Sequence, residues 1–168
     1  MNQYTVITGD VMNSRSYNNI NEILTERLKN IKYPESMIVP FKISRGDEIQ
    51  AVFRGYISFP QFIRQIRYIL LNIDIRFGIG FGNIDEKSDE MSSWNMNGSA
   101  FYYAREALEK IEKENIFKTR FKSNSQIDKA INTILYLIDT FQLGWTDSQW
   151  GAIYYYEKKE LIKKLPRN

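Results

Sequence analysis

The chain contains neither cysteine nor histidine. The absence of cysteine excludes disulfide bonds, thiolate metal sites and cysteine nucleophiles. The absence of histidine excludes Ser-His-Asp catalysis, histidine general bases and most zinc sites. Any catalysis must therefore rest on carboxylates, lysine, arginine, tyrosine, hydroxyl groups or a bound metal ion.

Long hydrophobic runs are also absent. The longest apolar stretch, residues 131–141, is interrupted by Asn132, Thr133 and Asp139 and is too short to span a bilayer. The N-terminus lacks the charged region followed by an apolar stretch that marks a signal peptide. We therefore expect a cytoplasmic protein that does not enter a membrane.

The formal net charge is only +3, and it is unevenly distributed. Residues 151–168 hold five basic and two acidic side chains, whereas the remainder of the chain is balanced. Such a basic tail can contact DNA or a protein partner, but a solvated helix end has the same composition. With 168 residues, 43% of them apolar, the chain is long enough for one compact core.

The spacing of apolar residues predicts the elements of the fold. Strands are expected at residues 3–9, 37–44, 48–54 and 73–82, helices from residue 20, from Pro60 and at 98–113, and a short extra strand at 116–122. The order strand, helix, hairpin, helix, strand, helix predicts an α+β fold with a ferredoxin-like βαββαβ layout, also called a palm.

The character of the chain changes after Ser123. A strongly apolar helix follows and ends near Gly144, and Thr146 and Asp147 are suitable N-caps for a second helix. We expect a palm domain at residues 1–123 and a C-terminal helical appendage, packed on that domain, at residues 124–168.

Two aspartates stand at the ends of predicted strands. Asp10 follows the apolar run through Ile7, and Asp47 lies in the hairpin turn after Gly46. If the strands are neighbours, the carboxylates converge at one sheet edge, where a divalent cation such as Mg²⁺ would relieve their repulsion. The alternative is that both are turn or capping residues without a metal.

The strand at 73–82 carries three alternating glycines, at positions 78, 80 and 82. Glycine in a strand allows another backbone or a ligand to approach closely. The pattern leaves open whether a packed helix or a ligand occupies this face.

Several segments resemble motifs of the SatD family of bacterial proteins. Residues 7–15 (ITGDVMNSR) resemble the opening motif and residues 45–50 (RGDEIQ) the hairpin motif of that family, and residues 76–80 and 98–108 also fit. A wider resemblance is to the nucleotide-cyclase superfamily, which includes class III adenylyl cyclases, GGDEF diguanylate cyclases and CRISPR polymerase palms.

The wider resemblance implies a metal–nucleotide site. Asp10 and Asp47 would be metal ligands and catalytic residues, with the carbonyl of Val11 as a third ligand for Mg²⁺ or Mn²⁺. The phosphates of a nucleoside triphosphate would meet backbone N–H groups and basic side chains. The implied nucleotide-binding residues are Val11, Met12, Asn13, Ser14, Arg15, Arg45 and Gly46. Because cyclase-type sites are often shared between subunits, the resemblance also implies a possible homodimer.

The chain departs from the superfamily at specific positions. Arg45 stands where GGDEF proteins have a second glycine, and Ile49 where they have phenylalanine. Tyr102 and Glu106 stand where class III cyclases carry asparagine and arginine, and Arg105 is one residue away, about 100° around the helix.

Two classes of function follow from these patterns. The first is metal-dependent nucleotide binding, with nucleotidyl or phosphoryl transfer as a possible activity. The second is a DNA-binding or regulatory protein in which the palm senses a ligand or mediates dimerisation. Residues 145–150 (WTDSQW) resemble the start of a helix-turn-helix, whose recognition helix would fall beyond Asn168. A pseudoenzyme scaffold is a third hypothesis.

Overall fold

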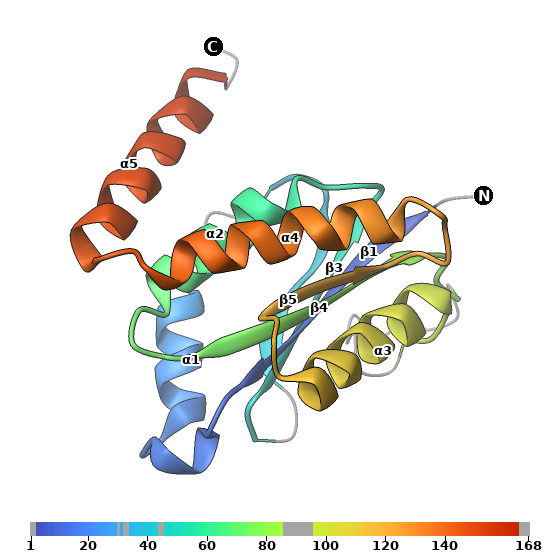
Figure 1. Ribbon diagram of the computed structural model, residues 1–168, viewed down its shortest axis with the longest axis horizontal. Coiled ribbons are helices and arrows are strands. Elements are labelled where there is room, and N and C mark those ends of the chain that lie inside the picture. The colour runs from blue at the N-terminus through green and yellow to red at the C-terminus, as the bar shows by residue number, and fades with distance from the viewer. Residues whose placement is uncertain (1–2, 30, 32–33, 44–45, 86–95, 165–168) are drawn as a thin grey trace.

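The fold is built around a five-stranded mixed sheet (Figure 1). The computed structural model describes residues 3–29, 31, 34–43, 46–85 and 96–164, except the side chains of 160–164. The strands are β1 (Tyr4–Val11), β2 (Met37–Ile43), β3 (Glu48–Arg54), β4 (Ile75–Gly82) and β5 (Thr119–Lys122). Their spatial order is β2-β3-β1-β4-β5. The first four pair antiparallel, and β5 pairs parallel with β4.

Five α-helices are present within the described residues, and with the sheet they confirm the predicted α+β class. They are α1 (Ile20–Leu28), α2 (Phe59–Ile69), α3 (Ser99–Glu114), α4 (Asp128–Leu143) and α5 (Asp147–Lys164). Side chains of α1, α2 and α4 join one hydrophobic cluster with the sheet, whereas α3 packs on the opposite face. None of the described helices combines the length and apolarity needed to cross a membrane.

The glycines of β4 make room for α3. A Cβ atom at Gly78 would lie 2.2 Å from the carbonyl oxygen of Ala104, and one at Gly80 would lie 2.0 Å from that of Ala100. Both contacts are with the helix backbone, so only glycine allows α3 to lie this close to the strand. The alternation of β4 places the large side chains of Phe77 and Ile79 on the other face, where they are fully buried. Of the two sequence-based interpretations, helix packing is the one that the structure supports.

Helix α4 is fixed on the sheet by polar side chains. The Asn132 side chain accepts from the Phe121 N–H and donates to the Phe121 carbonyl, both at 2.8 Å. Two helical turns further along α4, the buried Asp139 carboxylate accepts from the Lys118 N–H at 3.0 Å and from the Arg67 guanidinium at 2.7 Å. These anchors, seven residues apart on the helix, set its rotation about its own axis.

Helix α5 contacts the body of the protein through α2. Tyr68 of α2 stacks on Tyr154 with ring centroids 4.3 Å apart, and Arg64 pairs with Glu157. Figure 1 shows α5 leading away from the sheet beyond the end of α4. The contact with α2 therefore leaves much of α5 exposed, including Tyr155 and Tyr156.

Candidate metal–nucleotide site

An open groove of about 720 Å³ lies at the C-terminal end of β1. It brings together residues from the end of β1, the following loop, the β2–β3 turn and the start of β4. The lining residues are Asp10, Val11, Asn13, Ser14, Arg15, Ser16, Asp47 and Arg76. Asp10 and Asp47, which are 37 positions apart in the chain, thus border the same groove, because β1 pairs with β3.

Asp10 is the middle residue of a charged row across three strands, with an acidic neighbour on one side and a basic neighbour on the other. Its strand neighbours are Glu48 on β3 and Arg76 on β4. The Arg76 guanidinium donates to Asp10 Oδ2 from Nε at 2.8 Å and from a terminal nitrogen at 2.7 Å. Arg76 also lies 3.5 Å from Glu112 of α3. The side chains of Asp10 and Arg76 are only 13% and 19% exposed, so this pair is more strongly coupled than a surface ion pair.

Asp47 is placed differently from Asp10. It lies in the turn before β3, is half-buried, and within the described part of the chain its carboxylate has neither a hydrogen bond nor an ion pair. The next residue, Glu48, pairs with Arg105 of α3 at 2.9 Å. The carboxylate of Asp47 is therefore available to a ligand in the groove, whereas that of Glu48 is engaged.

The loop after β1 supplies hydrogen-bond donors. Asn13 has left-handed backbone angles (φ 52°, ψ 37°), and residues 14–16 form a 3₁₀ turn, η1. A left-handed residue followed by right-handed ones turns successive N–H groups toward one side, which forms an anion-binding concavity. Considering the described residues alone, the N–H groups of Asn13, Ser14 and Arg15 have no acceptor in the protein.

This loop is held in place at both of its ends. The Met12 N–H donates to the Asp74 carbonyl at 2.8 Å, and the Tyr17 hydroxyl donates to the Asn72 carbonyl at 3.2 Å. Within the loop, the Ser16 hydroxyl donates to the Asn13 carbonyl at 2.8 Å. The exposed N–H groups are thus presented by a hydrogen-bonded turn, which lowers the entropic cost of binding an anion.

The sequence-based set of phosphate-binding residues needs one correction. Because the Met12 N–H already bonds Asp74, it is not available to a phosphate, and the available donors begin at Asn13. Gly46 adjoins Asp47 with a φ of +91° but does not line the groove, and Arg45 lies outside the described residues. Arg15 lines the groove with an exposed side chain.

Sequence reasoning missed Arg76. The alternation of β4 placed it on the same face as the three glycines, which was a usable signal. Its partner Asp10 became evident only with the pairing of β1 and β4, in which these two residues are directly opposite.

The carboxylate oxygens at the groove would supply only part of the ligands of a cation. The described residues contain no group of three or more acidic, histidine or cysteine side chains placed to hold a metal. Two carboxylates border the groove, and the formal charges of Asp10, Asp47, Arg15 and Arg76 cancel. This donor set fits Mg²⁺ bound through one or two carboxylates with the remaining positions filled by phosphate oxygens and water, which is common for this ion.

Comparison with known proteins gives a family match. A sequence model of the SatD family matches residues 4–163, which include the sheet and most of the two C-terminal helices. No curated protein matches the chain.

Proposed function

The chain belongs to the SatD family, and we propose that its groove binds a nucleoside triphosphate together with Mg²⁺ or Mn²⁺. The observation that supports this proposal is that one groove combines the Asp47 carboxylate with the N–H groups of residues 13–15, none of which has a partner among the described residues. Carboxylates attract a cation and the N–H groups attract an anion, so a metal–phosphate ligand satisfies both.

The topology favours this interpretation. The first four strands occur in the spatial order β2-β3-β1-β4, and the two helices between them, α1 and α2, pack on one face. This arrangement is consistent with a ferredoxin-like βαββαβ unit, and we propose that it is of the palm type. In such a unit the β1 end and the β2–β3 turn are adjacent, which is where Asp10 and Asp47 border the groove.

The phosphate end of the ligand would lie against the loop after β1. The N–H groups of Asn13, Ser14 and Arg15 would bind phosphate oxygens, and the Arg15 side chain would add positive charge. Hydrogen bonds to a charged oxygen are stronger than those between neutral groups. The fixed loop geometry described above would orient the phosphates toward Asp10 and Asp47.

Asp10, Asp47 and the Val11 carbonyl would hold the metal ion, which when bound supplies charge neutralisation and activation of an attacking hydroxyl. The neutral groove has little attraction for a free cation, because Arg76 already offsets Asp10. A triphosphate brings its own negative charge, so we expect the metal to bind with the nucleotide rather than before it. Arg76 would act as a positioning residue that orients the Asp10 carboxylate.

The proposal is for binding, with phosphoryl or nucleotidyl transfer as the reaction class to be tested. Cyclisation of the class III type is not proposed. Tyr102, at the position of the cyclase asparagine, is 70% exposed, and Glu106, at that of the arginine, pairs with Lys122.

The experiment is calorimetric titration with ATP and GTP, each with and without Mg²⁺ or Mn²⁺, on the unchanged chain and on Asp47→Ala. Asp85→Asn is the matched control, because Asp85 is an exposed aspartate outside the groove. We expect metal-dependent binding that Asp47→Ala abolishes and Asp85→Asn preserves. Absence of binding under every condition, or equal binding by both variants, would overturn the proposal.

A further inference from the structure

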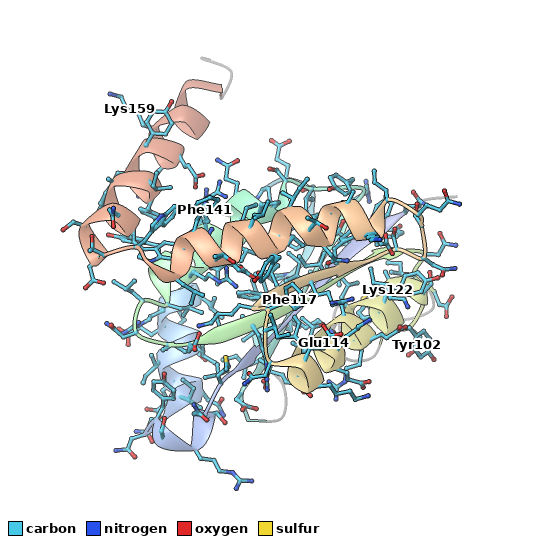
Figure 2. The ribbon with its side chains drawn as sticks, viewed as in Figure 1. Tyr102, Glu114, Phe117, Lys122, Phe141 and Lys159 are labelled. Carbon is cyan, nitrogen blue, oxygen red and sulfur yellow. The ribbon has the colours of Figure 1, made fainter. Side chains whose placement is uncertain are left out.

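Helix α4 carries an apolar stripe on its solvent side. The stripe consists of Ile127, Ala130, Ile134, Leu137 and Phe141, all exposed, with Phe141 at 70%. The spacing between successive members is three, four, three and four residues, which is the seam pattern of a two-helix coiled coil. Figure 2 labels Phe141 on α4.

The stripe cannot be an inner face that has rotated outward. Asn132 and Asp139 lie on the opposite side of α4, where they bond to β5 and to the segment that leads into it. Turning the helix to bury Ile134 would break these hydrogen bonds and expose the carboxylate that neutralises Arg67. The structure therefore fixes an apolar surface in solvent.

Along α4, the residues beside the stripe are uncharged from Ala130 onward. From Ala130 to Leu143 the only charged residue is Asp139, which is buried. Thr133 and Thr140 flank the stripe, and their hydroxyls donate to the carbonyls of Lys129 and Tyr136 on the same helix, at 3.0 and 2.8 Å. Covering the stripe would thus leave neither a charge nor these two hydroxyl donors unpaired.

The size of the apolar surface matches a protein interface. The exposed large side chains of the stripe, Ile127, Ile134, Leu137 and Phe141, present roughly 500 Å², which is at the upper end of the range for the largest apolar patch of a monomer. Two such surfaces would bury roughly 1,000 Å², the lower limit for a specific protein–protein interface.

We propose that this stripe pairs α4 with α4 of a second copy of the chain, in an antiparallel arrangement about a two-fold axis. An antiparallel pair centred between residues 135 and 136 sets Ala130 opposite Phe141 and Ile134 opposite Leu137. The smallest side chain thus faces the largest, and two of intermediate size face each other, as an interdigitated seam requires. A parallel pair would set Phe141 against Phe141 and leave a void at Ala130.

The absence of charge on the stripe favours a second copy of the chain, rather than a different protein, as its partner. A two-fold pair places each residue near its own counterpart, so any charge beside the axis would face a like charge. The stripe has no such charge, and it offers no charged group by which a different partner would be recognised.

Sedimentation of the full chain tests the dimer. We expect a dimer at about 10 μM and an increase of at least 100-fold in its dissociation constant for Leu137→Glu. Tyr102→Glu is the control, since Tyr102 is also 70% exposed but lies on α3. Circular dichroism melting checks that each variant is folded. A monomer at all concentrations, or a dimer that Leu137→Glu leaves intact, would overturn the proposal.

Disulfide cross-linking tests the direction of the pair, because the chain has no cysteine of its own. In the antiparallel pair, position 130 lies about 16 Å along the axis from its counterpart, beyond the reach of a disulfide. Ala130→Cys alone should therefore remain uncross-linked, whereas a mixture of Ala130→Cys and Phe141→Cys chains should form a mixed disulfide. Efficient cross-linking of Ala130→Cys with itself would contradict the antiparallel arrangement.

Discussion

Replacing Gly80 by alanine tests how closely α3 lies on the sheet. The new methyl carbon would lie 2.0 Å from the Ala100 carbonyl oxygen and 2.4 Å from the Ala104 nitrogen. The shorter distance is about 1.5 Å less than the roughly 3.5 Å at which non-bonded heavy atoms attract best. Because both obstacles are helix backbone, α3 must move as a body or the strand must distort.

The expected cost is at the upper end of the range for overpacked cores, about 2–3 kcal/mol. It outweighs the gain of about 0.4–1 kcal/mol that alanine brings by restricting the unfolded chain. The measurement is urea unfolding, in which the midpoint should fall by about 1 M for an m-value near 2 kcal/mol/M.

Gly144→Ala is the matched control, since its φ is −92° and the nearest atom to an added Cβ is 3.9 Å away. It should leave the free energy of unfolding within about 0.5 kcal/mol of its original value, or raise it. If Gly80→Ala were as stable as Gly144→Ala, α3 would not lie against β4 as described, and the glycines would need another explanation.

Three further predictions concern charged and titrating groups. Asp139→Ala leaves the guanidinium of Arg67 buried without its partner, and we expect urea unfolding to show a loss of about 3–5 kcal/mol; a loss below 1 kcal/mol would contradict the anchoring of α4. Burial, with a smaller contribution from Tyr155, raises the pKa of Tyr68 above its usual value of 10.0. Its packing against α5 is therefore fully stabilising below pH 10 and weakens as the pH rises further, and an ultraviolet titration should lose a component that titrates above pH 10 in Tyr68→Phe. Arg15→Ala should weaken nucleoside triphosphate binding about tenfold in calorimetry; unchanged affinity would remove Arg15 from the phosphate site.

Local sequence patterns predicted most of the elements of the fold. The alternation at 73–82 and the turn at Gly46-Asp47 predicted β4 and the hairpin close to their observed bounds. The order of the elements, matched to a ferredoxin-like layout, predicted that Asp10 and Asp47 end neighbouring strands. These features depend on side-chain period and turn chemistry, which act over a few residues.

Long-range pairing explains what the sequence did not reveal. The partner of Asp10 depends on the register between β1 and β4, which no local pattern specifies. The apolar residues of α4 predicted a helix but not its orientation, because Asn132 and Asp139 bond to the sheet while Ile134 faces solvent. Hydrophobicity alone does not decide between the two sides, because the sheet-facing side carries Ile131 and Leu135 and the solvent side carries Ile134 and Leu137.

The central claim is that a metal–nucleotide complex occupies the groove between Asp10, Asp47 and the loop after β1. The most direct measurement is paramagnetic broadening of backbone amide signals in ¹⁵N-labelled protein on adding Mn²⁺ with a non-hydrolysable nucleotide. We predict that the amides of residues 13–15 and Asp47 broaden first, while that of Ile134 on α4 is unaffected. Broadening centred on the basic C-terminal segment, or spread evenly over the surface, would contradict the claim.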